Sequence, residues 1–164
     1  NQTAYQQKHT GMRSIDVSNQ WPYKDYKSIH NEYLNLFDRS NEDLIKIEAL
    51  KRLIFLNWEF AVEDSYFTGI EFLDEASIAN SYKKLNKYIR EDKLDKEFKW
   101  MLSFYASWDF VFFPYSENKL EELTTFVRKV DTSKINFPKK TLDKRVMDNR
   151  GQMGVYWKEL VEKD

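Results

Sequence analysis

Apolar side chains recur along this chain with the spacing of helix faces. From Asp25 onward they fall at steps of three and four residues, which places them on one side of a helix. The residues that share this face are Tyr26, Ile29, Tyr33, Leu36 and Phe37. Similar stripes predict helices over 75–90, 117–130 and 151–163, with a short helix near 142–148. The pattern therefore predicts a fold built almost entirely from α-helices.

Two longer segments, 41–63 and 95–113, are apolar on nearly all sides rather than on one face. A helix of that kind is buried by its neighbours, so we expect these two helices to form the middle of the fold. The run Ser40-Asn41-Glu42-Asp43 resembles a capping box and predicts the start of the first helix. Pro114 predicts the end of the second, because proline does not continue a helix.

The two apolar segments align with each other at an offset of 50 residues. The matching pairs are Leu44 with Leu94, Lys46 with Lys96, Trp58 with Trp108, and Phe60 with Phe110. Each segment also follows a more polar predicted helix, which indicates a helical-hairpin repeat near the upper end of HEAT-type periods. Aromatic-rich helices also align by chance, so a plain helical bundle is an equally weighted alternative.

The predicted fold class is thus all-α, a single domain of stacked antiparallel helical hairpins that is either HEAT-like or an irregular helical bundle. We assign residues 25–164 to this helical domain. Residues 1–24 show no sustained period and contain Gly11 and Pro22, so we predict that they form an extended N-terminal arm.

Composition excludes several other classes of protein. The 164 residues include only 4 glycines and 3 prolines, which argues against a β-sandwich or barrel with many tight turns. Cysteine is absent, which rules out a disulfide scaffold, a thiolate zinc site and a cysteine nucleophile. The apolar runs are too short to cross a bilayer, so we expect no membrane partner and a cytoplasmic location. The chain begins with Asn1 rather than methionine, which leaves the removal of an upstream segment open.

Charge is the most informative pattern for function. The net charge is only −1, yet residues 59–75 carry six carboxylates and no Lys or Arg. Aromatic side chains are interleaved with these acids, which suits a basic protein partner better than it suits water. The residues that we predict to bind this partner are Glu63, Asp64, Tyr66, Phe67, Glu71, Phe72, Asp74 and Glu75. The alternative, with about equal weight, is that these carboxylates face solvent or are neutralised within the fold.

The stretch 128–150 has the opposite charge, with eight basic residues against three acidic ones. It could neutralise the acidic residues of 59–75 or contact nucleic acid. A near-neutral net charge and the lack of a recognisable reading helix make nucleic-acid binding the weaker hypothesis.

A second class of function would use carboxylates. Glu59 and Glu63 lie four residues apart, and Asp109 takes the place of Glu59 in the second apolar segment. If they converge, they could bind a metal or share a proton, as in an enzyme or a ligand-binding protein. We favour the simpler interpretation that each pairs with a basic residue, with Arg145 and Arg150 as candidates, or points to a solvated edge.

Histidine and glycine offer little further chemistry. His9 and His30 have no metal-binding spacing and are expected at surface or capping positions, so we predict no catalytic residue, metal or cofactor. Gly151 and Gly154 lie beside Arg150 at a predicted helix start, which allows an anion site. We favour close packing of a neighbouring backbone against these glycines, because that is their commoner role at this spacing.

The helical build, the lack of a recognisable active-site motif and the acidic aromatic segment are similar in type to bacterial toxin-neutralising immunity proteins. Such proteins block a target by occupying it. The similarity rests on no family motif, and no functional residue is transferred through it. We therefore expect a non-enzymatic protein-binding module of the immunity or adaptor kind, with the partner and the oligomeric state left open.

Overall fold

The structure, a computed structural model, describes residues 25–134 and 142–162. Within these two ranges all regular secondary structure is helical, and neither range contains a strand. The prediction of an all-α fold is therefore confirmed. The N-terminal arm predicted over 1–24 lies outside the described residues.

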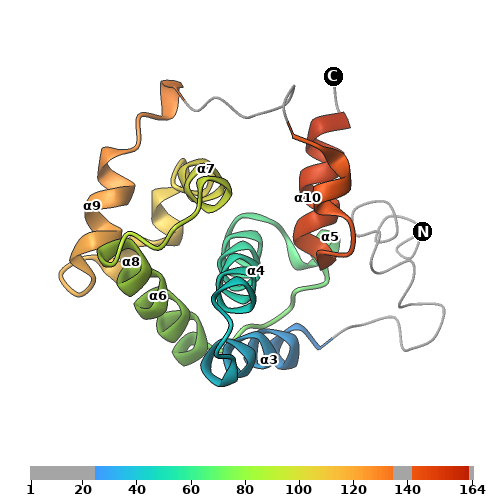
Figure 1. The fold of residues 1–164 in the computed structure, drawn as a ribbon, viewed down its shortest axis with the longest axis horizontal. Coiled ribbons are helices and arrows are strands. Elements are labelled where there is room, and N and C mark those ends of the chain that lie inside the picture. Colours follow the sequence, from blue (N-terminus) through green and yellow to red (C-terminus); the bar gives the residue numbers. More distant parts are fainter. Residues whose placement is uncertain (1–24, 135–141, 163–164) are drawn as a thin grey trace.

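Helix α4 (Asp43–Val62) forms the centre of the molecule. Figure 1 shows it surrounded by α3 (Tyr26–Arg39), α6 (Glu75–Arg90), α7 (Lys96–Tyr105) and α10 (Gly151–Glu162). Apart from Arg52, every residue from 49 to 59 is buried, because this stretch is apolar on nearly all sides and each side meets another helix. The expectation of a central, buried helix in this part of the chain is confirmed.

Three aspartates begin the surrounding helices. Asp25 accepts a hydrogen bond from the amide of Ser28 at the start of α3, and Asp74 accepts one from Ser77 at the start of α6. Asp95 does the same for Phe98 at the start of α7, with an N···O distance of 2.7 Å. Each carboxylate satisfies an amide that has no partner inside its helix and stabilises the positive end of the helix dipole.

The capping box predicted at Ser40 is wrong. Helix α4 begins at Asp43, and the residue before it, Glu42, makes no side-chain capping hydrogen bond. Ser40 instead ends α3, and its hydroxyl accepts a hydrogen bond from the amide of Glu42 at 3.1 Å. The serine therefore shapes the turn between two helices rather than opening the second of them.

The long helix predicted over 95–113 is divided into shorter elements. Helix α7 ends at Tyr105, and a turn leads into the 3₁₀ helix η1 (Asp109–Val111) and the single-turn helix α8 (Phe113–Ser116). Pro114 lies in the first turn of α8, where a missing N–H is tolerated, so it does not terminate a helix as predicted.

The division of this segment bears on the predicted repeat. Trp58 lies within the 20-residue helix α4 and is 2% exposed, whereas Trp108 lies in the turn that follows the 10-residue helix α7 and is half-buried. The two rings do meet, with centroids 5.4 Å apart. The structural setting of the two tryptophans differs, and the hairpin repeat stays a prediction.

The remaining described elements are short. Helix α5 (Ser65–Thr68) is a single turn, and α9 (Glu121–Lys129) and the 3₁₀ helices η2 (Thr132–Lys134) and η3 (Lys144–Met147) complete the set. Among the residues that the structure describes, none of the helices combines the length and apolar character that crossing a lipid bilayer requires.

An aromatic cluster holds the C-terminal helix α10 against the centre. The ring of Trp58 stacks on Tyr105 of α7 with centroids 5.1 Å apart and meets Tyr156 of α10 at 5.2 Å. Trp157 is fully buried, and its Nε1 donates a hydrogen bond to the Tyr105 hydroxyl at 3.3 Å. Rings from three separate helices thus form one continuous part of the core.

Candidate functional site

The acidic aromatic segment, which we define as residues 59–75, places three large rings on the surface. Tyr66 is 50% exposed, Phe67 38% and Phe72 55%. The carboxylates of Glu63, Asp64, Glu71 and Glu75 are exposed around them. Large exposed apolar side chains this close together are typical of contact surfaces.

Buried neighbours hold these rings outward. Ile70 and Leu73 are each 1% exposed and fix the connection between α5 and α6 to the core. The Thr68 hydroxyl accepts a hydrogen bond from the Ile70 amide, and Gly69 ends α5 with a left-handed φ of 70° that favours glycine. The backbone is therefore anchored, and the side chains that point away from the core form the surface.

Among the described residues, the exposed carboxylates of the segment have no counter-ion within ion-pair distance. In the described part of the chain, none of Glu63, Asp64, Glu71 and Glu75 takes part in an ion pair. One cation lies nearby, because the Lys27 ammonium stands 5.1 Å from the centroid of the Phe72 ring. The segment thus combines uncompensated negative charge with aromatic faces that already accept a cation.

Asp74 has a structural role in addition to its place in the predicted set. Its carboxylate accepts hydrogen bonds from both the hydroxyl and the amide of Ser77. The side-chain hydrogen bond, followed by the one from the amide, holds the pKa of Asp74 below its ordinary value. Changing Asp74 would therefore disturb the start of α6 as well as any contact with a partner.

The basic stretch 128–150 does not pair with the acidic aromatic segment in the described residues. Its bases that form ion pairs use other carboxylates: Arg128 with Glu117, Lys144 with Glu162, Arg145 with Asp143, and Arg150 with Glu48 and Glu97. Neutralisation of the segment by direct pairing with this stretch is therefore not observed there.

The three carboxylates of the alternative site do not share one environment. Glu59 is 6% exposed, whereas Glu63 and Asp109 are exposed. Burial raises the pKa of Tyr156, and the charges of Glu59 and Glu63 raise it further, so these two carboxylates act on the same ring. Among the described residues, no group of three or more His, Asp or Glu side chains is placed to hold a metal ion.

Arg145 and Arg150, the candidate partners of those carboxylates, form ion pairs with other residues. The exposure of Glu63 and Asp109 agrees with the other part of the expectation, a solvated edge. Arg150 instead holds Glu48 of α4 through Nε and Nη2 at 3.0 and 2.6 Å, and Glu97 of α7 through Nη1 and Nη2 at the same two distances. Lys51 completes the group by donating to Glu97 at 2.9 Å and to Asp95 at 2.7 Å. These charges join α4, α7 and the start of α10.

Arg150 determines the protonation of its two partners. Burial alone would raise the pKa of Glu48 and of Glu97, but hydrogen bonds and charge from Arg150, with help from Arg52 and Lys51, outweigh it. Both pKa values therefore lie below those of an ordinary glutamate, and both carboxylates are ionised at neutral pH. Sequence reasoning missed this group because its members are far apart in the chain and follow no local spacing.

The two glycines after Arg150 serve packing. A Cβ atom at Gly154 would lie 2.2 Å from the carbonyl oxygen of Met147, which no side chain could tolerate without a shift of the backbone. Gly151 has a φ of 63°, in the left-handed region that favours glycine. The donors of Arg150 are engaged by Glu48, Glu97 and the sulfur of Met147, which leaves none for an anion.

His30 is buried rather than at the surface, which corrects the expectation for this histidine; His9 lies outside the described residues. His30 Nε2 donates to Asn57 Oδ1 at 2.8 Å, and Asn57 Nδ2 donates to Ser81 Oγ at 2.8 Å. Burial lowers the pKa of His30 below its ordinary value, partly offset by Asn57 and Asp74, so the ring is neutral. The three polar side chains join α3, α4 and α6.

Comparisons of the chain with protein-family models, with curated proteins and with solved structures found no match. The interpretation of its function therefore rests on the geometry and charge described above.

Proposed function

We propose that the chain is a non-enzymatic protein-binding module that uses the acidic aromatic segment to bind a basic partner, in the manner of an immunity or adaptor protein. The observation that carries the proposal is the group of exposed carboxylates around the exposed rings of Tyr66 and Phe72, none of which forms an ion pair within the part of the chain that the structure describes. The same segment holds the other predicted contact residues, Glu63, Asp64, Phe67, Glu71, Asp74 and Glu75.

Two parts of the binding free energy would come from this surface. Burial of the rings removes apolar area from water, at roughly 25 cal/mol per Å². The carboxylates attract a positively charged surface before contact and raise the association rate, an effect that salt screens. The like charges of these carboxylates also repel one another in the unbound protein, and a basic partner removes that repulsion.

The contact between Lys27 and Phe72 indicates how a partner would bind. An ammonium already lies over this ring, which belongs to a segment with six carboxylates and no Lys or Arg. Arg or Lys side chains of a partner could occupy equivalent positions over Tyr66, between the ring face and a carboxylate. Aromatic and acidic residues would then act on the same cation.

The test compares charge reversals on and away from the segment. Glu63→Lys with Glu71→Lys changes two exposed carboxylates that make no hydrogen bond or ion pair in the described residues. Glu63 also follows the last residue of α4, where a positive charge is favourable to the helix dipole, so thermal stability should hold or rise. The control is Glu32→Lys with Glu121→Lys, which makes the same change in net charge at exposed positions on α3 and α9.

The wild-type chain is used to capture and identify a partner from the native host, and binding is then measured between the two purified proteins. We expect a basic partner, an association rate that falls steeply with salt, and at least a tenfold loss of affinity in the Glu63 and Glu71 variant. The proposal is contradicted if this variant and its control bind the partner with equal affinity, or if the association rate does not change with salt concentration.

A further inference from the structure

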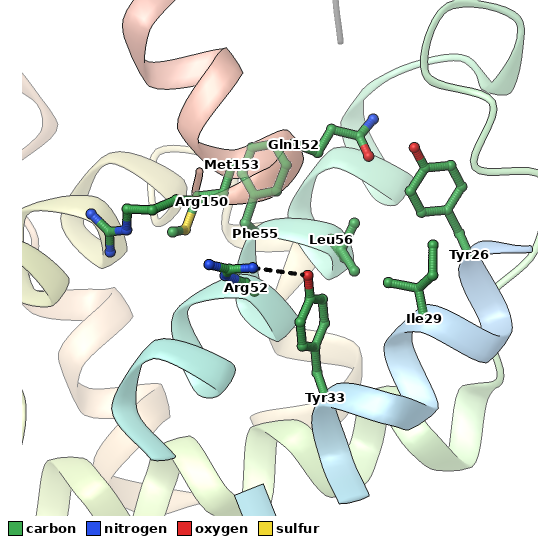
Figure 2. Close-up of a pocket in the computed structure, with 9 residues that line it drawn as sticks. All are labelled: Tyr26, Ile29, Tyr33, Arg52, Phe55, Leu56, Arg150, Gln152 and Met153. Carbon is green, nitrogen blue, oxygen red and sulfur yellow. Dashed lines mark hydrogen bonds between the residues drawn. The ribbon is translucent and has the colours of Figure 1, made fainter. Parts of the chain in front are cut away.

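One side of α4 is closed to a partner. Figure 2 shows side chains of α3 and α10 meeting over this helix, with Arg52 donating to the Tyr33 hydroxyl at 3.3 Å. Gln152 lies buried among them, without a hydrogen-bond partner in the described residues. The space left between the three helices holds about one water molecule. A side chain of a partner therefore binds elsewhere, and the C-terminal end of α4 offers such a place.

The 3₁₀ helix η1 packs against α4 close to the start of the acidic aromatic segment. Trp108, the residue before η1, meets Trp58 in the last part of α4 with ring centroids 5.4 Å apart. The other end of the segment is also near, because α8, which follows η1, packs against α6 (Figure 1). Burial raises the pKa of Tyr115 in α8, and the charge of Glu75 raises it further. The elements η1 and α8 thus lie next to both ends of the segment.

Two exposed residues of η1 combine a carboxylate with an aromatic ring. Asp109 is exposed, and the side chain of Phe110 is 56% exposed. The next two residues, Val111 and Phe112, are buried, and the Val111 carbonyl oxygen accepts a hydrogen bond from the Tyr82 hydroxyl at 3.2 Å. The backbone of η1 is therefore fixed to the core while the ring of Phe110 stays at the surface.

A neighbouring part of the chain shows how a ring and a carboxylate hold an arginine together. The guanidinium carbon of Arg128 in α9 lies 5.7 Å from the centroid of the Phe113 ring in α8. The Nη2 atom of the same arginine pairs with Glu117 at 2.8 Å. One planar group thus contacts a ring face and a carboxylate at once, and the compact, strongly hydrated ammonium group of lysine is less suited to this.

Asp109 and Phe110 offer the same two groups with no arginine between them. Within the ranges 25–134 and 142–162, no Lys or Arg lies over the Phe110 ring, and Asp109 forms no ion pair. The ring and the carboxylate are adjacent in sequence and both are exposed to solvent. This part of the surface therefore has the chemistry of an arginine site that the described chain does not fill.

We propose that Asp109 and Phe110 bind an arginine side chain of the basic partner and so extend the contact surface beyond the acidic aromatic segment. This inference rests on the proposed function, from which it takes the positive charge of the partner. The guanidinium group lies on the face of the Phe110 ring and donates its N–H groups to the Asp109 carboxylate. Lysine binds more weakly there, because its ammonium group cannot lie flat on a ring and donate in its own plane.

The test uses two defined probes, hexa-arginine amide and hexa-lysine amide, which carry the same charge. Each is added at low salt to the full, ¹⁵N-labelled chain, and the backbone amide resonances of Asp109 and Phe110 are followed. We expect saturable shifts with hexa-arginine and at least about threefold weaker binding of hexa-lysine at these two amides.

The pair Asp43 and Leu44 is the internal control. It is also an exposed carboxylate followed by an exposed apolar residue, but it has no ring and lies at the opposite end of α4. Its amides should show no preference for hexa-arginine over hexa-lysine. A general attraction between peptide and protein charge would instead act on both pairs alike.

Two variants separate the ring from the charge. Phe110→Leu keeps an apolar side chain and removes the ring, whereas Asp109→Asn keeps the shape and removes the charge. Each should weaken the binding of hexa-arginine at least about threefold and reduce the difference between the two peptides, while Leu44→Ala should change neither. Thermal melts check that the variants are folded, and if one of them is not, the other carries the test.

Three results would overturn the inference. They are no saturable shift at Asp109 and Phe110, equal affinity of the two peptides at these amides, and unchanged binding of hexa-arginine in both variants. If shifts occur only around Tyr66 and Phe72, the contact surface ends at the segment and the proposed function stands without this site. The proposed function itself fails only in the charge-reversal experiment with the native partner, so the two can be distinguished.

Discussion

Arg150 and Glu48 lie 102 positions apart in the chain, yet Nε and Nη2 of the arginine meet the two carboxylate oxygens of the glutamate at 3.0 and 2.6 Å. This bidentate pair fixes the first turn of α10 to α4, and the bonds from the same guanidinium to Glu97 fix it to α7 as well. The C-terminal helix therefore has an ionic attachment at its start and an aromatic one through Tyr156 and Trp157 further along.

Removal of the arginine should leave two partly buried carboxylates without their main counter-ion. We expect Arg150→Met to lower the free energy of unfolding by about 2–3 kcal/mol, less than for a fully buried pair because Glu48 and Glu97 keep some contact with water. Urea denaturation measures the loss. Arg145→Met, at an exposed residue, is the control and should change the free energy by less than about 0.5 kcal/mol. Equal effects of the two substitutions would contradict the role assigned to Arg150.

The same attachment predicts a response to acid. Glu48 and Glu97 have pKa values below those of the unfolded chain, so they stabilise the fold above the ordinary glutamate pKa and lose that contribution as the pH falls through their folded values. Arg150→Met should weaken this dependence. The measurement is the urea midpoint between pH 3 and pH 6, and parallel curves for the two proteins would refute the prediction.

His30 predicts a second pH window, close to neutral. The unfolded histidine binds a proton near pH 6.5, whereas burial lowers the pKa of the folded one, so the unfolded state holds more protons below that pH. Stability should therefore fall as the pH drops from about 7 to 5, by at most about 1.4 kcal/mol per pH unit. In a His9→Gln background, His30→Gln should reduce the change of the free energy of unfolding with pH. If the change with pH persists in this variant, His30 is not its cause.

Gly154 should tolerate no side chain. A Cβ atom there meets the Met147 carbonyl oxygen at 2.2 Å, and this oxygen belongs to the backbone and cannot rotate away. We expect Gly154→Ala to destabilise the protein by about 2 kcal/mol, although alanine ordinarily stabilises a helix relative to glycine. A thermal melt in which Gly154→Ala matches or exceeds the wild type would show that the turn before α10 can open at little cost.

Trp58 and Trp108 should differ in their contribution to stability. Trp58 is buried and meets rings of α4, α7 and α10, so Trp58→Ala should cost about 4 kcal/mol. Trp108 is half-buried and lies outside a helix, and its removal should cost about half as much. Equal losses on chemical denaturation would instead favour the equivalence that a hairpin repeat implies.

Local signals explain which parts of the fold could be predicted. Helix α6 was expected over 75–90 and has those bounds, because Asp74 caps its start and a clear apolar stripe defines its face. The segment 95–113 is apolar on all sides and so carries no such stripe. Its division after Tyr105 accompanies the packing of the Trp108 ring against Trp58 and Phe104, which are contacts that no local pattern encodes.

In the candidate site, too, the features set by local sequence could be predicted and those set by long-range packing could not. Tyr66, Phe67 and Phe72 are exposed, and the binding role that a local run of acids and rings suggested for them stays a prediction. Arg150 pairs with Glu48 and Glu97 and not with the carboxylates for which it was a candidate, because a long-range ion pair depends on how three helices pack rather than on spacing. Gln152 was not singled out, since only the packed structure shows a buried amide that has no hydrogen-bond partner among the described residues.

Contacts between indole rings give the packing of α10 a spectroscopic signal. Trp100 of α7 meets Trp157 of α10 edge to face with centroids 4.7 Å apart, while Trp58 and Trp108 form another pair at 5.4 Å. Transitions of rings this close couple, so the near-ultraviolet circular dichroism should carry a signal that belongs to the pairs rather than to single indoles. Detachment of α10 would separate Trp100 from Trp157 and erase part of that signal while the helices themselves persist. The near-ultraviolet circular dichroism of the unlabelled chain therefore reports whether α10 is packed against α7.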